Sequence, residues 1–250
     1  MTNLIDQARN REWFYPYELP DGNVVSSYHG GELDLIHATR WGMLERRLKA
    51  EHPHGFAGLK AVDLAAHQGW FAHNLAGMGL TDVLGIDARA RHVEDASLMA
   101  RIQGHDGLEF RQGDVFEIDA NDLGTFDVVL MLGLLYHVEN PVGALRVARS
   151  LCSGLCVIET QVAPNLSGML DYGSYRFVRP MKGSFAIIDE MADTEGPEAS
   201  VTGICLVPSL EALTWCMEKV GFRDIEVLPP PEDGYEQLVH GKRVMVAARA

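Results

Sequence analysis

Short apolar runs alternate with longer mixed stretches through the middle of the chain. The mixed stretches, such as 69–79, 90–103 and 141–152, have the length and spacing of helices. A strand, a helix and a second strand in this rhythm form βαβ units, which build a parallel sheet covered by helices on both faces. Two more strands are expected near the C-terminus. The pattern predicts an α/β, Rossmann-like, mostly parallel sheet of seven strands flanked by helices, at residues 60–66, 82–87, 107–114, 126–132, 155–160, 224–228 and 243–248.

The regions outside this rhythm predict a cap and an insertion. Residues 1–58 combine turn signals with an amphipathic helix pattern from about 33 to 48, so we expect a helical N-terminal cap and substrate segment. Residues 59–250 form the second expected domain. Within it, residues 162–207 break the rhythm with several Gly and Pro, and we expect them to form a lid-like insertion.

Two proton-handling side chains follow the predicted strand 126–132. Tyr136 and His137 come just after this strand, and ligands of open parallel sheets bind outside the carboxyl ends of the strands. A neutral imidazole near pH 7 suits proton removal, so His137 is the candidate general base. We expect Tyr136 to hydrogen-bond a ligand. Glu159, at the end of strand 155–160, is the third candidate catalytic residue and is expected to face the pocket.

Acidic residues stand near the ends of three successive predicted strands: Asp63, Asp87 and Asp114. A carboxylate at the end of the second strand is placed to accept hydrogen bonds from ribose hydroxyls. The turn after the first strand holds His67 and a single glycine, Gly69. A dinucleotide-binding turn needs G-x-G-x-x-G, because pyrophosphate must approach bare backbone. The pattern therefore favours a nucleoside ligand without pyrophosphate over a dinucleotide such as NAD.

The segments AVDLAAHQGWFA, LGID, GDV and FDVVLMLGLLYHVENP, in this order and spacing, resemble the class I S-adenosylmethionine (SAM) dependent methyltransferases. The resemblance implies SAM as cofactor and S-adenosylhomocysteine (SAH) as product. It implies that the first turn holds the methionine part, the second acid the ribose, and the third acid with the next residue the adenine. In the family's usual D-x-G-x-G-x-G turn, Ala65 and His67 replace the first two glycines here. The candidate cofactor-binding residues are Asp63, Ala65, His67, Gly69, Asp87, Asp114, Val115 and Leu132.

A narrower likeness joins W-x-x-x-x-E-L-P-D-G, residues 13–22, with L-Y-H-V-E-N-P and I-E-T. This combination is similar to the subgroup of tRNA wobble-uridine methyl- and carboxymethyltransferases. However, the net charge is −14 and no dense Lys/Arg cluster is present, whereas phosphate contacts dominate nucleic-acid affinity. We therefore carry over the fold and the SAM site but not the tRNA substrate.

Aromatic, imidazole and guanidinium side chains of the cap and the insertion are the candidates to line an acceptor pocket. They are Trp13, Tyr15, Tyr17, His29, Arg40 and Trp41 in the cap, and Tyr172, Tyr175 and Arg176 in the insertion. A metal is not expected, because the spaced pair Cys152 and Cys156 lacks a second pair with zinc-like spacing.

The predicted function is methyl transfer from SAM to a small-molecule acceptor, with a hydroxyl favoured over an amine. Three alternatives stay open at this point: a tRNA-modifying enzyme, an NAD-dependent oxidoreductase on a similar sheet, and a non-catalytic SAM-binding protein. No apolar run of about 20 residues and no signal-peptide pattern is present, so we expect a cytoplasmic protein that needs no membrane. A homodimer is one oligomeric state that the sequence allows.

Overall fold

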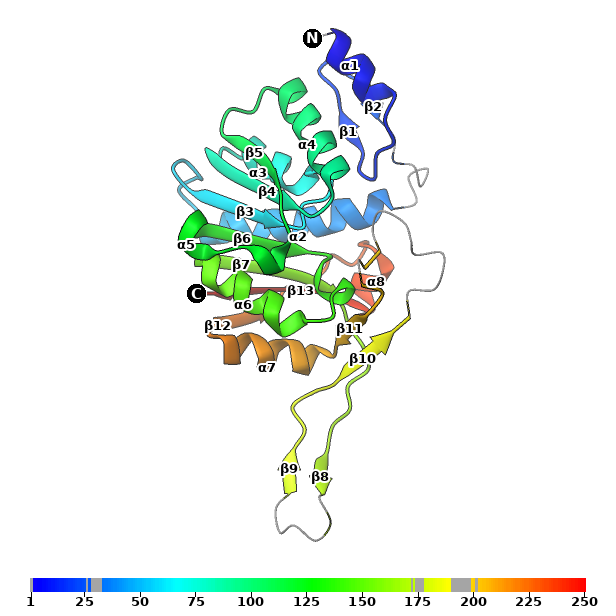
Figure 1. Cartoon of the computed structure of the whole chain (residues 1–250), viewed down its shortest axis with the longest axis vertical. Coiled ribbons are helices and arrows are strands. Elements are labelled where there is room, and N and C mark those ends of the chain that lie inside the picture. Colours follow the sequence, from blue (N-terminus) through cyan, green and yellow to red (C-terminus); the bar gives the residue numbers. More distant parts are fainter. Residues whose placement is uncertain are drawn as a thin grey trace.

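The computed structural model describes residues 2–25, 27, 33–171, 173, 178–189, 199, 200 and 202–250. A seven-stranded sheet forms its centre, in the order β12-β13-β7-β6-β3-β4-β5 (Figure 1). The strands β3 to β7 run parallel, whereas β13 runs antiparallel to β7 and β12 antiparallel to β13. The predicted fold class is thereby confirmed. The strands are β3 (Lys60–Leu64), β4 (Asp82–Asp87), β5 (Leu108–Gln112), β6 (Phe126–Leu132), β7 (Cys152–Gln161), β12 (Arg223–Val227) and β13 (Arg243–Arg249).

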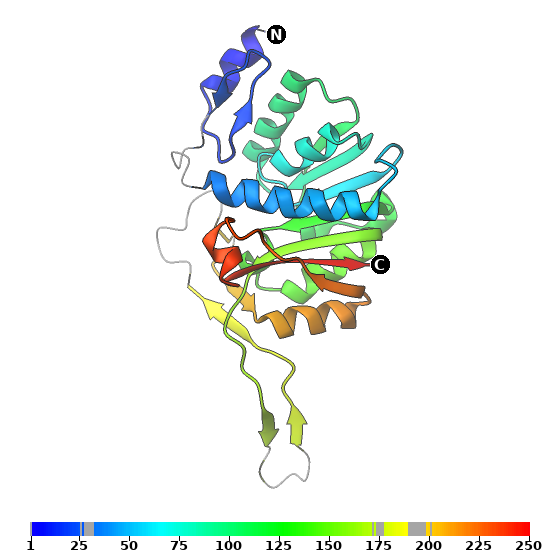
Figure 2. The same cartoon turned by 180° about the vertical axis from the view of Figure 1, so that it is seen from behind.

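Helices cover both faces of the sheet, and the alternation of side chains along β6 shows why. Val128, Leu130 and Leu132 belong to one hydrophobic core, whereas Val129 and Met131 belong to the other. On the first face lie α2 (Asp34–Glu51), α3 (Trp70–Gly77) and α4 (Ala90–Gln103), with α2 in front in Figure 2. On the second face lie α5 (Ala120–Leu123), α6 (Pro141–Leu151) and α7 (Leu210–Val220), and α8 (Glu236–Val239) precedes β13.

The strand order reverses between β3 and β6. From β3 the chain proceeds outward to β4 and β5, and then returns to place β6 on the other side of β3. The connections after β3 and β6 diverge at such a switch point and leave a crevice at the carboxyl ends of the strands. The ligand site is expected at this edge of the sheet.

The N-terminal segment packs against the turn that follows β3. It comprises α1 (Thr2–Arg9), β1 (Tyr17–Glu18) and β2 (Val24–Val25). The side chain of Gln68 accepts a hydrogen bond from Phe14 N at 2.7 Å and donates one to Glu12 O at 2.9 Å. The hydroxyl of Tyr17 donates to the carbonyl of Gln68 at 2.7 Å. The cap is therefore fastened to the loop that leaves the first strand of the sheet.

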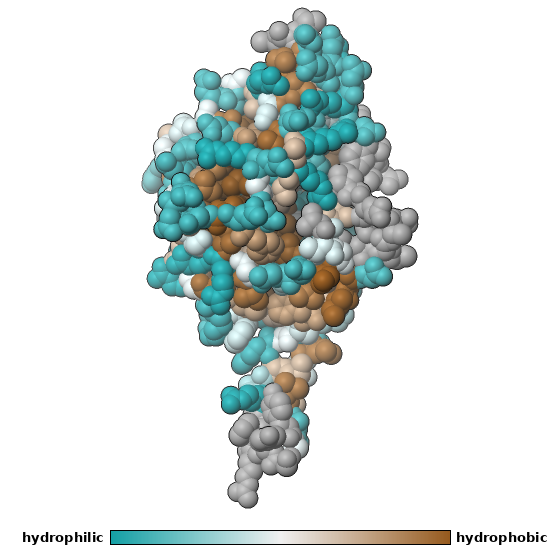
Figure 3. All heavy atoms as spheres, viewed as in Figure 1, coloured by the Kyte–Doolittle hydropathy of each residue, from teal (hydrophilic) through white to brown (hydrophobic). Residues whose placement is uncertain are grey.

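The described part of residues 162–207 forms a projecting arm and a short hairpin. The arm ends in β8 (Met169–Asp171) and β9 (Val178–Pro180), which lie far from the sheet in both views (Figures 1 and 2). β10 (Phe185–Ile188) pairs with β11 (Cys205–Pro208) nearer the body. Apolar side chains of the arm, such as Leu166 and Met169, are exposed, and Figure 3 shows apolar surface along the arm. β8 and β9 thus lie away from the crevice, and the lid expected from residues 162–207 stays a prediction.

None of the helices in the described ranges combines the length and the apolar character needed to cross a membrane.

Candidate active site

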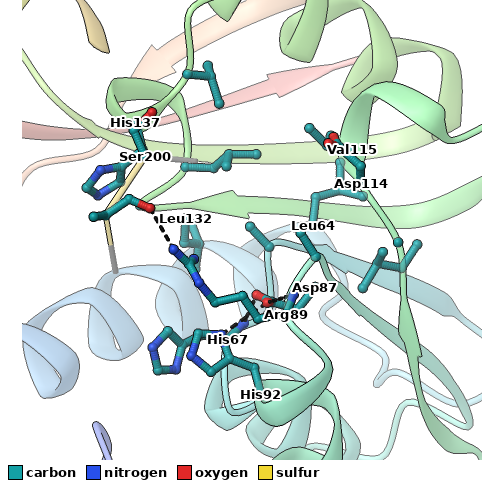
Figure 4. Close-up of a pocket in the computed structure, with 18 of the residues that line it drawn as sticks. Leu64, His67, Asp87, Arg89, His92, Asp114, Val115, Leu132, His137 and Ser200 are labelled. Atoms are coloured by element: carbon teal, nitrogen blue, oxygen red, sulfur yellow. Dashed lines mark hydrogen bonds and ion pairs between the residues drawn. The ribbon is translucent and has the colours of Figure 1, made fainter. Parts of the chain in front are cut away.

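A pocket of about 360 Å³ lies at the carboxyl ends of β3, β4, β5 and β6 (Figure 4). This volume falls in the range of small-molecule sites, roughly 300–1,000 Å³. The turns after the four strands supply most of its wall. The N-terminal segment and α2 add Phe14, Tyr15 and Arg40, and the segment between β10 and β11 adds Ala199, Ser200 and Thr202.

The turn after β3 has an unusual backbone. Ala65 and His67 have φ angles of 58° and 51°, a left-handed backbone conformation that residues other than glycine seldom adopt. Gly69 follows with φ 82°, and a Cβ at this position would lie 2.5 Å from the ring of Phe110. The glycine is therefore required by packing against β5. The left-handed turn directs the backbone N–H of His67 to Asp87 Oδ2 at 2.8 Å.

Asp87 ends β4 at the centre of the pocket wall. Its Oδ1 accepts hydrogen bonds from Arg89 N at 2.9 Å and from His92 Nδ1 at 3.0 Å. Burial works to raise the pKa of Asp87, but the hydrogen bond and charge of His92 and the bond from Arg89 N outweigh it and lower the pKa. Asp87 is therefore ionised and accepts hydrogen bonds only.

Two imidazole rings stack beside this carboxylate. The rings of His67 and His92 lie 3.7 Å apart between centroids, with an interplanar angle of 28°. Burial, followed by the proximity of His92, lowers the pKa of His67 well below its usual range. His67 is therefore neutral at physiological pH. The stack restricts the orientation of both rings beside Asp87.

Asp114 and Val115 line the pocket at the end of β5 (Figure 4). Asp114 caps the short 3₁₀ helix Val115–Glu117, and its Oδ1 accepts a hydrogen bond from Phe116 N at 2.9 Å. A carboxylate has about four lone-pair sites, so Asp114 keeps acceptor capacity for a further donor.

Tyr136 and His137 lie in a short 3₁₀ helix, Leu135–His137, that follows β6, and both line the pocket. Their rings are 4.1 Å apart between centroids. Arg243 on β13 fixes Tyr136: its Nη1 and Nη2 donate to the tyrosine hydroxyl at 3.1 and 3.2 Å. Because the tyrosine oxygen accepts both bonds, its own O–H remains able to donate to another group.

Glu159 lies behind this pair and holds two arginines. It is fully buried, with Oε2 at 2.9 Å from Arg40 Nη2 and Oε1 at 2.9 Å from Arg243 Nη1. Burial opposes the charge of Arg243, but Glu159 and Tyr136 raise its pKa overall. Glu159 does not line the pocket. It therefore connects α2, β7 and β13 beneath the pocket floor.

The structure brings together most of the residues predicted to bind the cofactor. Ala65, His67, Asp87, Asp114, Val115 and Leu132 line the pocket. Gly69 lies one turn away, at the start of α3, and does not line it. Asp63 is buried behind the turn and does not line it either. Burial is the main cause that raises the pKa of Asp63 to about 7, with Arg40 acting in the opposite direction.

The predicted acceptor-binding residues divide into three groups. Tyr15 and Arg40 line the pocket. Trp13, Tyr17 and Trp41 pack in or against the hydrophobic core beside it and do not contribute to its wall. The other candidates lie outside the described residues: His29, Tyr172, Tyr175 and Arg176.

Sequence reasoning missed Phe14, Arg89 and His92, which all line the pocket. Phe14 directly precedes Tyr15, which the sequence did single out. Arg89 and His92 follow Asp87 by two and five residues, at the start of α4. The sequence could have indicated both residues. The first residues of a helix that follows a strand lie close to an acidic residue at the end of that strand. Arg89 Nη2 donates to Ala199 O at 2.8 Å across the pocket (Figure 4).

Comparisons with known proteins agree with this architecture. Residues 56–174 match the family described as a methyltransferase domain. The N-terminal domain of EvdMO1, solved with SAH bound, covers 100% of this chain at a TM-score of 0.73 and 22% identity, with 96% of its own chain covered. The glycopeptide N-methyltransferase MtfA, solved with SAM, covers 83% of this chain at a TM-score of 0.55 and 16% identity, with 93% of its own chain covered. At these identities the two structures show the fold alone.

Two curated relatives differ in the reaction that their names give. The ubiquinone biosynthesis O-methyltransferase of Acinetobacter baylyi is 32% identical over 101 residues, which are 40% of this chain and 42% of the relative. The tRNA U34 carboxymethyltransferase of Geobacter sp. is 25% identical over 201 residues, which are 80% of this chain and 54% of the relative. The chain spans about half the length of the curated relatives that it matches.

Residues 56–174 therefore carry a methyltransferase domain, in line with the resemblance to the class I SAM-dependent methyltransferases. SAM is the cofactor of this family, and the pocket fits it on chemical grounds. Asp87 and Asp114 line the same pocket and keep unused acceptor capacity, and a nucleoside carries hydroxyl and amino groups that can donate to carboxylates. Among the described residues, no cluster of three or more His, Cys, Asp or Glu side chains is placed to bind a metal ion.

Proposed function

We propose that this chain transfers a methyl group from SAM to a hydroxyl of a small-molecule acceptor, with His137 as general base. The observation that supports this proposal is that a single pocket is lined by the carboxylates of Asp87 and Asp114 and also by His137. Nucleoside recognition and proton removal would then act in one cavity. The two carboxylates follow β4 and β5, whereas His137 follows β6 on the other side of β3.

The residues of the β3, β4 and β5 turns would hold the cofactor. SAM supplies, when bound, a methyl group that its sulfonium has already activated. Asp87 accepts a hydrogen bond from a ribose hydroxyl and Asp114 one from the adenine amino group, while Val115 covers the base. The left-handed turn at Ala65 and His67 lets backbone approach the methionine part. Leu132 contributes apolar surface at the end of β6.

The residues that follow β6 would act on the acceptor. His137 accepts the proton of the acceptor hydroxyl, a contribution worth about 10²–10⁴ in rate. Tyr136, held by Arg243, donates its O–H to the ligand and orients it. Phe14, Tyr15 and Arg40 form the wall that limits the acceptor and excludes water. Such positioning supplies about 7–11 kcal/mol of the barrier in well-oriented reactions.

The test is a titration followed by a transfer assay. SAM and SAH are titrated calorimetrically, and radiolabelled methyl transfer is then measured with small phenols, sugars and amines. We expect both cofactors to bind and label to reach a hydroxyl compound. Failure to bind SAH at millimolar concentration contradicts the proposal outright. Binding without transfer to any acceptor favours a non-catalytic SAM-binding protein. Transfer to amines alone contradicts the hydroxyl acceptor and the assignment of His137 as general base.

Two curated relatives whose matches span most of the chain favour one second candidate. Two tRNA U34 carboxymethyltransferases match 75% and 80% of this chain. Modification of a tRNA uridine is therefore the alternative function, and the net charge of −14 opposes it. Binding to unmodified tRNA at low and moderate salt separates the two, because phosphate contacts give a steep salt dependence. Salt-sensitive binding together with label transfer to tRNA would replace the small-molecule acceptor.

We also propose that the chain works in a reducing compartment, in line with the cytoplasm expected from its sequence. Cys152 and Cys156 are buried, and burial raises the pKa of Cys152 to about 11, so its thiol stays protonated. Cell fractionation tests this location. The homodimer stays a prediction, which light scattering of the purified protein tests.

A further inference from the structure

The carboxylate of Asp87 has little unused acceptor capacity. Its Oδ1 already accepts Arg89 N at 2.9 Å and His92 Nδ1 at 3.0 Å, and its Oδ2 accepts His67 N at 2.8 Å. A carboxylate offers about four lone-pair sites. The protein itself fills three of them, and the remaining site is on Oδ2.

A ribose presents two neighbouring hydroxyl groups, so Asp87 in this state can accept from one of them. The second hydroxyl needs another partner in the same wall. The polar side chains that line the pocket next to Asp87 are Arg89, His92 and His67. Of these, Arg89 already uses Nη2 on Ala199 O at 2.8 Å, and both ring nitrogens of His67 are buried.

His92 has an available nitrogen in a fixed ring. Because Asp87 is ionised and only accepts, Nδ1 of His92 carries the proton in their shared hydrogen bond. The other nitrogen, Nε2, has no hydrogen-bond partner among the described residues, and it is not one of the fully buried polar atoms. His92 lines the pocket, and stacking on His67 at 3.7 Å restricts rotation of the ring.

We propose that His92 is a second ribose-binding residue, so that one hydroxyl donates to Asp87 Oδ2 and its neighbour pairs with His92 Nε2. This inference rests on the proposed SAM site and adds a residue to it. A hydroxyl both donates and accepts, so the pairing holds whether or not Nε2 carries a proton. The pair Asp87–His92 then requires both ribose hydroxyls and discriminates against deoxyribose.

The test combines variants of His92 with deoxy analogues of SAH in calorimetric titrations of the full chain. His92→Asn keeps a nitrogen near the position of Nδ1 but removes Nε2. We expect it to weaken SAH about three- to tenfold, the usual effect of one neutral hydrogen bond. One of the two analogues, 2′-deoxy-SAH or 3′-deoxy-SAH, lacks the hydroxyl that pairs with His92. For that analogue we expect His92→Asn to lower the affinity by less than about twofold. His105→Asn, outside the pocket lining, is the control and leaves all affinities unchanged.

The result that overturns the inference is an equal loss for SAH and both deoxy analogues, or no loss at all. Where thermal melting shows that His92→Asn does not fold, nitrogen NMR of the histidine-labelled wild type decides. The Nε2 resonance of His92 then shifts with SAH but not with the analogue that lacks its hydroxyl, and an unmoved resonance overturns the inference. Wild type that ignores SAH altogether instead contradicts the proposed function.

Discussion

Arg40 on α2 places its Nη2 2.9 Å from Oε2 of Glu159 at the end of β7, and both side chains are buried. The pair joins α2, which precedes the sheet in the sequence, to β7 in the sheet. Arg40 also lines the pocket, with its guanidinium 5.1 Å from the ring centre of Phe71. The wall of the pocket and the stability of the cap therefore depend on the same side chain.

Arg40→Met is expected to destabilise the fold by about 2–4 kcal/mol. Loss of one partner from a buried ion pair leaves an under-compensated charge, and here Arg243 still holds Glu159 and limits the loss. Urea denaturation measures the effect. Lys49→Gln is the matched control, because it removes an exposed pair with Glu45 and is expected to cost under about 1 kcal/mol. Equal effects of the two variants would contradict the structural role of Arg40.

Asp87→Asn is expected to weaken SAH binding about 10- to 100-fold. The amide has half the acceptor capacity and no charge, and hydrogen bonds to charged groups are worth about 1.5–3 kcal/mol. Asp82→Asn, at the other end of β4 and on the surface, is the control and leaves the affinity unchanged. Calorimetric titration of both variants against wild type is the measurement, and an Asp87 variant with wild-type affinity would remove the ribose assignment.

His137→Ala is expected to lower kcat for a hydroxyl acceptor by about 10²–10⁴ with little change in SAH affinity, because the base acts on the acceptor. Added imidazole should restore part of the rate in this variant. A structural role for His137 would show no such rescue. His240→Ala, beyond α8 and outside the pocket lining, serves as the control.

Asp63 is expected to make stability fall as pH rises from about 4 to about 7. Burial raises its pKa in the folded chain to about 7, above the ordinary value of 3.8. The folded chain therefore binds this proton more tightly than the unfolded chain does. The free energy of unfolding falls as the carboxyl of the folded chain ionises. Asp63→Asn should be more stable than wild type by about 2–4 kcal/mol at pH 8 and equal to it near pH 4. Urea denaturation at both pH values checks this, and a constant difference would exclude titration of Asp63.

Much of the sheet was predictable because its strands are buried on both faces and read as continuous apolar runs. Residues 82–87 and 126–132 coincide with β4 and β6, and residues 90–103 coincide with α4. The short strands β8 and β9 were not predicted. They form by pairing with each other away from any core, so no hydrophobic pattern marks them.

The candidate site was predictable where it follows strand ends and less so elsewhere. Asp87 and His137 share a pocket because parallel strands end at one edge of the sheet. In the extended N-terminal segment, the sequence does not say which of several aromatic residues turns toward the pocket: of the candidates Trp13, Tyr15 and Tyr17 only Tyr15 lines it, together with Phe14. That choice depends on tertiary packing against the turn at Gln68.

The arm leaves and rejoins the body at a single point. Ser184 accepts a hydrogen bond from Leu166 N at 3.2 Å and donates one to Pro164 O at 3.0 Å, so the two ends of the excursion are clipped together. Residues between the ends can be lengthened, shortened or exchanged without altering how the flanking strands meet. We therefore expect the length and sequence of the arm to vary among homologues while the pocket stays the same. The junction at Ser184 is also a suitable position for the insertion of foreign loops.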